Sequence, residues 1–357
     1  MLFARQAPRW RRRRLPDLSP ATTIDPKPTP APDPTPDPTP TPVSFIPADA
    51  DWWFDASRLS DATIASWNND AAKYSYNAAP AKVVDLTKHG MPGKLRLKND
   101  AVKPRCVASG PNKGAVRAVR CPKGGKDPTG GPTDTKDWQE LDAAHNLCAA
   151  IRSNGELWTL PYGRLFEVGF KFLVPAPSDA DLAAFNPPGC QWTIIWEWVS
   201  SDNRTTECWG VRLNHYANAP QQILLQSGYS AGGKEQETYW GPNGTYFSPG
   251  ISKGEFPSNL GKPWVPNRWY AIRIRGVIDK ETGKNGDRGW ADMYIDDMKT
   301  PFSSARNARC GKSDDVEAKA SNWGQYSDYD LRGFKRCIYF DQMYIKLGAT
   351  GYPSAPK

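Results

Sequence analysis

The sequence predicts an all-β protein in which two sheets pack face to face. Apolar and polar residues alternate along many short runs, and this two-residue period is typical of half-buried strands. Gly, Pro, Asn and Asp separate the runs about every ten residues, as turns do in β-sandwiches. No long segment has the period of an amphipathic helix. These observations indicate a two-sheet β-sandwich.

The chain of 357 residues begins with two segments whose composition argues against a packed structure. Residues 1–24 are expected to form a disordered basic tail. Residues 1–20 hold six Arg and one Asp, so their net charge of +5 leaves +3 of the chain's +8 for the rest. In residues 25–42, nine Pro alternate with Thr, Asp, Ala and Lys. This pattern predicts an extended polyproline-II linker, which at about 3.1 Å per residue would span roughly 50 Å.

The tail lacks the apolar core of a secretory signal peptide, and no stretch of the chain has the length of a membrane span. An Arg-rich arm over residues 5–14 can bind nucleic acid or an anionic surface, and a basic leader without a partner is the alternative. The linker and two glycosylation sequons, at Asn203 and Asn243, favour an extracellular or virion-associated location.

The remaining residues, 43–357, predict a single body made of strands. Trp52, Trp53 and Phe54 open this body. The next alternating runs are VVDL (83–86), KLRLK (94–98), AVRAVRC (115–121), GRLFEVGFKFLVP (163–175), QWTIIWEWVS (191–200), ECWGVRLNHY (207–216) and QQILLQSG (221–228). The polar residues 122–137 are expected to form a surface loop. Residues 137–151 are compatible either with a helix at their beginning or with a strand at their end.

The last ninety residues carry the clearest strand pattern. NRWYAIRIRGVID (267–279), GWADMYIDDMKTPF (289–302) and CIYFDQMYIKLGATGY (337–352) follow one another as three strands. The segment KETGKNGDRG between the first two is rich in Gly, Asn and Asp, so it predicts the turn of a hairpin.

One face of these strands is expected to be polar. Arg273 and Arg275 alternate with apolar residues, and Gln342, Tyr344 and Lys346 share one face of the last strand. A sheet face of Arg, Lys, Tyr and Gln suits an anionic ligand that is rich in hydroxyl groups. The pattern therefore predicts an acidic polysaccharide as the ligand.

The seven cysteines do not have the spacing of a zinc site. They are Cys106, Cys121, Cys148, Cys190, Cys208, Cys310 and Cys337. Neighbours in the sequence suggest the disulfides Cys106–Cys121, Cys190–Cys208 and Cys310–Cys337, with Cys148 left over, although connectivity cannot be read from a sequence.

The order of these motifs resembles the concanavalin A-like jelly rolls, and within them the polysaccharide lyases of the alginate lyase, glucuronan lyase and heparin lyase I type. YIKLGATGY (344–352) is similar to the closing Y-x-K-x-G-x-Y strand of those lyases, and RSNGEL (152–157) is similar to their R-[ST]-E-L with a two-residue insertion. LPYGRLFEVGFKFLVPA (160–176) is also similar to a segment of the laminarinase-type glycoside hydrolases.

The chain departs from both families at the central strand. The lyases carry Q-x-H there, whereas this sequence has Trp196 and Trp198 in those places. The hydrolases need E-x-D-x-x-E, and Glu197 is the only carboxylate on this strand. Because a retaining glycosidase needs two carboxyl groups at the scissile bond, the sequence disfavours hydrolysis.

The resemblance implies a polysaccharide lyase, which is a carbon–oxygen lyase. Elimination from a uronate needs a group that neutralises the carboxylate, a base for the C5 proton and an acid for the leaving oxygen. The residues given these roles are Arg152, Arg273 or Arg275 for neutralisation, His215 as the base, and Tyr352 as the acid, with Lys346 lowering its pKa. This chemistry requires no cofactor, a structural calcium ion is compatible with such jelly rolls, and a monomer is expected.

The competing hypothesis is a glycan-binding module, or a virion attachment module, that does not cleave its ligand. Trp196 and Trp198 would then stack on sugar rings, while Glu197 would bind a hydroxyl group. Arg273, Arg275, Gln342 and Tyr344 would contribute to substrate binding under either hypothesis. Convergence of His215, Lys346, Tyr352 and an Arg on one face of the sandwich would favour the lyase, and scatter would favour binding.

Overall fold

The computed structural model describes a large part of one compact unit that begins at Ser44. The described residues are 44–71, 82–97, 105–106, 109–120, 149–151, 159–174, 192–200, 207–214, 221–231, 234–247, 257, 259–281, 289–327 and 336–356. The tail and the linker lie outside these ranges, and so does the sequon at Asn203.

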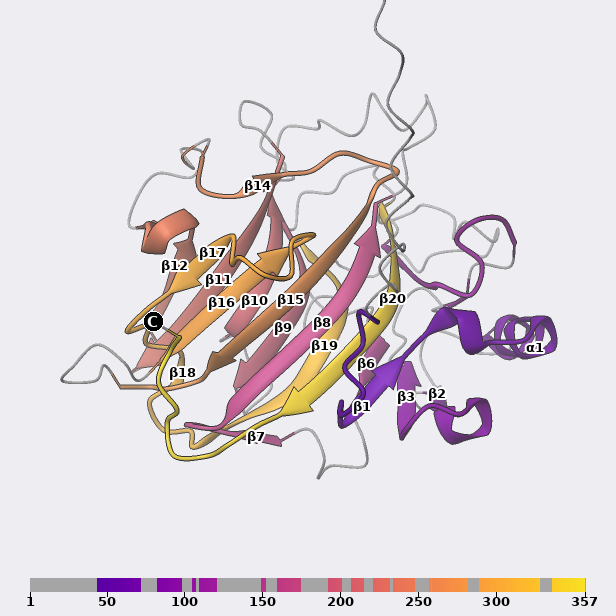
Figure 1. Cartoon of the computed structure of the whole chain (residues 1–357), viewed down its shortest axis with the longest axis horizontal. Helices are drawn as coiled ribbons and strands as arrows, with labels where there is room; N and C mark the ends of the chain where they lie inside the picture. The colour runs from indigo at the N-terminus through magenta and orange to yellow at the C-terminus, as the bar shows by residue number, and fades with distance from the viewer. Residues whose placement is uncertain are drawn as a thin grey trace, which may run out of the picture. The chain divides into compact units, whose positions relative to one another are not determined.

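The described residues form two large sheets, which we name the front sheet and the back sheet after their positions in Figure 1. The front sheet has the order β17 (Ser303–Ala305), β16 (Trp290–Ile295), β15 (Trp269–Val277), β8 (Leu165–Leu173), β20 (Arg336–Leu347), β5 (Val116–Arg120) and β4 (Arg105–Cys106), with β1 (Trp52–Phe54) on β20.

In the described part of the chain, the back sheet contains more strands than the front sheet. Its order is β13 (Tyr246–Phe247), β12 (Lys234–Trp240), β11 (Gln222–Ala231), β10 (Glu207–Asn214), β9 (Trp192–Ser200), β19 (Glu317–Ser327), β6 (Ala149–Ile151), β3 (Lys94–Leu97) and β2 (Lys82–Asp85). The short strands β14 (Lys262–Pro263) and β18 (Gly311–Lys312) pair with β11, and β7 (Thr159–Pro161) pairs with β19.

Helical structure is sparse in the described residues. The helices are α1 (Asp61–Ala71) and the 3₁₀ turns η1 (Ala56–Arg58), η2 (Leu86–His89) and η3 (Pro242–Gly244). No helix among them is long and apolar enough to cross a membrane. The structure therefore confirms the all-β sandwich that the alternating pattern predicted.

The three C-terminal strands form where the sequence placed them. β15 and β16 pair antiparallel from Ile272 opposite Ile295 to Val277 opposite Trp290, which confirms the predicted hairpin. β8 lies between β15 and β20 and is antiparallel to both. The turn residues 282–288 lie outside the described residues.

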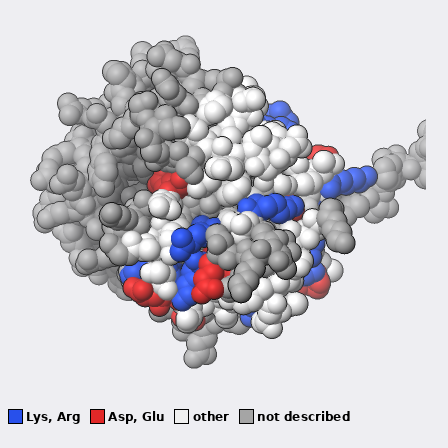
Figure 2. All heavy atoms as spheres, turned by 90° about the vertical axis from the view of Figure 1, so that its left-hand side faces the viewer, with Lys and Arg blue, Asp and Glu red and all other residues white. Residues whose placement is uncertain are grey.

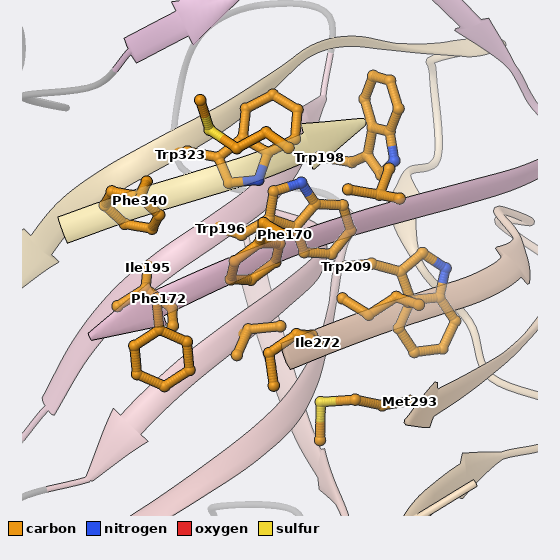
Figure 3. Packing of buried hydrophobic residues seen from close by; sticks show 14 of the residues in the cluster. Phe170, Phe172, Ile195, Trp196, Trp198, Trp209, Ile272, Met293, Trp323 and Phe340 are labelled. Atoms are coloured by element: carbon orange, nitrogen blue, oxygen red, sulfur yellow. The ribbon is translucent and has the colours of Figure 1, made fainter. Parts of the chain in front are cut away.

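The core between the sheets is unusually aromatic (Figure 3). Phe170 on β8 lies at its centre, with its ring centroid 6.5 Å from the centroids of both Trp196 and Trp323 and 6.2 Å from that of Phe340. These rings come from both sheets, so large side chains fill the gap between them. Most of the alternating apolar residues therefore pack in the core between the two sheets.

Gly169 of β8 is needed because the ring of Tyr344 on β20 lies directly across it. A Cβ atom at Gly169 would overlap that ring, whose hydroxyl donates to Glu167 Oε1 at 2.9 Å. We therefore expect Gly169→Ala to lower the free energy of unfolding by about 1–3 kcal/mol, measured by denaturant titration. In a Tyr344→Ala background the same change should cost little, and an equal cost in both backgrounds would contradict the contact.

Two cysteines contradict the predicted disulfides. Cys208 and Cys310 are free thiols that are completely buried in the core, so the pairs Cys190–Cys208 and Cys310–Cys337 are wrong. Both behave as small apolar residues that fill the core, and closeness in sequence did not reveal this. Cys121, Cys148 and Cys190 lie outside the described residues.

Burial should keep these two thiols unreactive. Burial is the main factor that raises the pKa of Cys208, and neighbouring Cys310 raises it further. Burial also raises the pKa of Cys310. Because the thiolate is the reactive form, iodoacetamide at pH 8 should alkylate Cys208 and Cys310 only after denaturant is added. Peptide mass spectrometry would check this, and alkylation of either residue in native buffer would contradict it.

Candidate functional site

The predicted site residues that the structure describes lie on two separate faces of the sandwich. Lys346, Arg273 and Arg275 belong to the outer face of the front sheet, since they alternate with core residues of β20 and β15. Glu197 belongs to the outer face of the back sheet, because its neighbours Trp196 and Trp198 point into the core. The aromatic core separates these two faces, so a single sugar unit cannot touch both sets.

Trp196 and Trp198 are the first correction, because neither can stack on a sugar. Both side chains are completely buried, and their rings contact Phe166 at centroid distances of 6.4 and 6.0 Å. A strand in a sandwich has one face in the core, and the hydrophobic effect places the Trp face there rather than Glu197. The W-E-W strand is therefore core structure, with its carboxylate facing outward.

Tyr344 is the second correction, because it is almost completely buried against Gly169. Its hydroxyl donates to Glu167, and its ring centroid lies 5.6 Å from that of Phe45. Burial, and then the nearby Glu167 carboxylate, raise the pKa of Tyr344 well above its usual value. In the described structure Tyr344 therefore serves as a packing residue of the front sheet.

Arg275 on the front sheet lies in a row of alternating charges. Across the strands, Lys346 pairs with Glu167, Glu167 pairs with Arg275, and Arg275 pairs with Asp292, so the sign of the charge alternates along the row. On the side of the molecule shown in Figure 2, positive and negative side chains of the described residues are likewise interspersed. This arrangement is typical of a solvated sheet surface with cross-strand charge pairs.

Arg273 occupies the next row on the same face. Its guanidinium lies 3.9 Å from the centroid of the Tyr294 ring and donates a hydrogen bond to the carbonyl of Met298. The roles of Arg273 and Arg275 in substrate binding stay predictions, but the described part of this face does not present a block of positive charge.

The closing motif 344–352 is also engaged in structural contacts. Lys346 Nζ bonds Asp49 Oδ2 at 2.6 Å, and this bond is the main factor that lowers the pKa of Asp49. The ring of Tyr352 packs on Gly163, and its amide donates to the Gly163 carbonyl at 2.8 Å. Gln342 lies in a β-bulge of β20, with a positive φ of 47°. The catalytic roles of Lys346 and Tyr352, and the binding role of Gln342, stay predictions.

His215 and Arg152 lie outside the described residues, so their predicted roles stay predictions as well. His215 directly follows β10, whose last residue is Asn214. Arg152 directly follows β6, whose last residue is Ile151. Both strands belong to the back sheet.

The outer face of the back sheet holds polar residues that the sequence analysis did not select. Tyr239 on β12 pairs with Gln226 on β11, Gln226 pairs with Gly210 on β10, and Gly210 pairs with Glu197 on β9. Gly210 adds no side chain to this row, and Gln226 and Glu197 on either side of it are almost completely buried. One row across four strands therefore carries a phenol, an amide and a carboxylate.

Arg212 joins this row to a second carboxylate. Its guanidinium lies 4.9 Å from the centroid of the Tyr239 ring and donates to the Tyr239 hydroxyl, which in turn donates to Glu237 Oε2. Arg212 Nη1 lies 3.7 Å from the same Glu237 oxygen. Arg212 and Tyr239 are almost completely buried, whereas 42% of the Glu237 side chain is exposed. Solvent therefore reaches this cluster at Glu237.

The cluster of Arg212, Tyr239 and Glu237 has the parts of an acid–base group. The carboxylate can take the phenolic proton, and the guanidinium can stabilise the phenolate that results. Burial of Arg212 strengthens these electrostatic interactions, because little water competes for them. One feature of the sequence could have indicated this cluster: the charged residue Arg212 lies between the apolar residues Val211 and Leu213, so it must point to the outer face.

No group of three or more His, Cys, Asp or Glu side chains gathers into a metal-binding cluster among the described residues. The structure therefore gives no support, within those residues, to the calcium ion that the resemblance allowed.

No protein-family model matches this sequence, and no curated protein matches it. Solved structures that resemble the chain include jelly-roll polysaccharide lyases, the class that the sequence motifs resemble. One is an endo-β-1,4-glucuronan lyase from the fungus Trichoderma reesei, with 11% identity, a TM-score of 0.42, and coverage of 72% of this chain and 90% of that chain. Another is the alginate lyase vAL-1 from Chlorella virus, with 13% identity, a TM-score of 0.33, and coverage of 74% and 98%.

A third similar structure is the binding domain of botulinum neurotoxin serotype G. It has 12% identity and a TM-score of 0.30, and the match covers 56% of this chain and 37% of that chain.

Proposed function

We propose that this protein is a polysaccharide lyase that cleaves an acidic polysaccharide by β-elimination on the outer face of its back sheet. One observation carries the proposal: the Tyr239 hydroxyl lies between the Arg212 guanidinium and the Glu237 carboxylate. This is the arrangement that a phenol needs in order to act as both base and acid. Gln226 and Glu197 extend the polar row along the same face.

The reaction requires only groups that this cluster supplies. Glu237 takes the phenolic proton, and Tyr239 then removes the C5 proton of the uronate. The electrons of the C5–H bond form a double bond to C4, and the bond from C4 to the glycosidic oxygen breaks. Tyr239 returns its proton to the departing oxygen. Arg212 stabilises the phenolate and the negative charge that develops on the uronate carboxylate.

Glycan binding without cleavage is the second candidate, and one observation favours it. Lys346, which the resemblance placed in the catalytic set, lies on β20 of the front sheet, across the core from Glu197, and bonds Asp49. The motif residues that the structure describes therefore do not assemble into one site. In this alternative, Arg212 and Gln226 would bind a uronate carboxylate, and Tyr239 would serve only to position Arg212.

The deciding experiment incubates the full chain with alginate, glucuronan, heparin and pectate and follows ultraviolet absorbance. A rise would report the unsaturated uronate that only β-elimination makes, and we expect it for at least one polymer. Binding of a polymer, measured by calorimetry, without any rise would select the glycan-binding alternative. Neither a rise nor binding with any of the four would overturn both candidates.

A further inference from the structure

The outer face of the front sheet is hollowed at one place. A shallow pocket of about 360 Å³ is lined by Lys171, Trp269, Ala271, Asp296 and Asp341. Ala271 on β15 pairs with Lys171 on β8, and Lys171 pairs with Asp341 on β20, so three adjacent strands form the floor. The hollow exists because Ala271 is small and its neighbours across the sheet are long.

Trp269 forms the aromatic wall of this pocket. It lies two residues before Ala271 on β15, so both side chains are on the same face. Its indole nitrogen donates to Asn112 Oδ1 at 3.0 Å, which fixes the orientation of the ring. The ring is only partly buried, so part of it remains accessible at the pocket.

The two carboxylates are held by the backbone around the pocket. Asp341 accepts hydrogen bonds from the amides of Ala56 at 2.8 Å and Gln342 at 2.7 Å. Both of these bonds use Oδ1. Asp296 accepts from the Ala271 amide at 3.1 Å and from Arg268 Nη2 at 2.7 Å.

Unusual backbone geometry accompanies both carboxylates. Asp296 has a φ of 64°, and Gln342, next to Asp341, has a φ of 47°. Such left-handed conformations are uncommon outside glycine and cluster at functional sites. The bulge between Asp341 and Tyr344 also breaks the regular alternation of β20, which re-aims the side chains there.

The charges around the pocket favour an uncharged ligand. Lys171 and Arg268 carry positive charge, and Asp296 and Asp341 carry negative charge, so the four groups balance. Burial raises the pKa of the Asp341 carboxyl above its usual value, and a second anion beside it would be disfavoured in the same way. An acidic sugar therefore fits this pocket less well than a neutral one.

We infer that this pocket is a second glycan-binding site, which takes one neutral sugar ring of a polysaccharide. The C–H face of the ring would stack on Trp269, and its hydroxyl groups would bond Asp341 and Lys171. The pocket volume is near the lower end of the range for small-molecule sites, which suits one ring. This site lies on the opposite side of the core from the Arg212 cluster, so it could hold a polymer independently of cleavage.

The test titrates the full chain with cellohexaose, laminarihexaose, mannohexaose and xylohexaose, using calorimetry. We expect at least one of them to bind, and Trp269→Ala to weaken that binding by about tenfold or more, which corresponds to about 1.4 kcal/mol. Ala271→Met, which fills the floor without removing a polar group, should have a similar effect. An oligomer of uronic acid should bind to this pocket more weakly than the best neutral hexamer.

Tyr239→Phe is the matched control, because it alters the back sheet and should leave neutral-sugar binding unchanged. Binding that survives both Trp269→Ala and Ala271→Met would overturn the inference. Absence of binding by all four hexamers would overturn it as well. Neither result would bear on β-elimination, which is read from absorbance with acidic polymers, so the two proposals can fail separately.

Discussion

Replacing Tyr239 by Phe is expected to lower the rate of β-elimination by about 10²–10⁴-fold, the usual contribution of a general acid–base group. The substitution keeps the ring that packs against Leu224 and Leu260, and it removes only the hydroxyl between Arg212 and Glu237. Without that oxygen, no group in the cluster can move a proton between C5 and the leaving oxygen. Initial rates with the best acidic polymer would measure the effect.

Tyr229→Phe is the matched control for this experiment. Tyr229 is also a buried tyrosine of the back sheet, and its hydroxyl also accepts a hydrogen bond from an arginine, Arg309. No carboxylate completes that pair in the described structure, so Tyr229→Phe should leave the rate unchanged. If Tyr239→Phe keeps the wild-type rate, the Arg212 cluster is structural and the proposed site is wrong.

Replacing Trp196 by Ala is expected to cost about 3–5 kcal/mol of folding stability. The indole is completely buried, and its ring packs against Phe166 and Phe170 of the opposite sheet. Its removal leaves a cavity in the middle of the core. Because a domain of this kind is stable by only about 5–15 kcal/mol, the loss should appear as a large fall in the denaturant midpoint.

The informative comparison is with Trp269→Ala on the outer face of the front sheet. That ring is only partly buried, so its loss should change stability much less than the loss of Trp196. Trp196→Phe, which retains most of the buried area, should fall between the two. If Trp196→Ala instead weakened glycan binding at unchanged stability, the assignment of the W-E-W strand to the core would be wrong.

Strands with one clearly apolar face could be predicted from the sequence. β15 alternates between core and outer residues, β8 and β20 do so over most of their length, and all three form where the pattern placed them. Polar strands were not predicted: KEQETYW forms β12 near the edge of the back sheet, where a weak apolar pattern suffices. The helix α1 was not predicted. Among its described side chains only that of Ile64 is buried, and one apolar position cannot show a helical period.

The candidate site could not be assembled from the sequence for a different reason. Alternation showed that Glu197 and its two Trp neighbours point in opposite directions, but the resemblance to lyases suggested the wrong side for the Trp residues. Burying the indoles is what the hydrophobic effect requires, and a reading based on residue chemistry alone would have placed them in the core. The predicted pairs Cys190–Cys208 and Cys310–Cys337 failed in the same way, since neighbours in sequence need not be neighbours in a core.

The sequence by itself determined the class of fold, the composition that sets residues 1–42 apart from the rest of the chain, and the period of each strong strand. These properties depend on local composition and on the two-residue repeat, which can be read from any short window. The tertiary structure decided which face of each strand meets the core, and which distant residues share a surface. Arg212 meets Tyr239, and Trp269 meets Asp341, only because sheet order and register are set by long-range pairing across many strands.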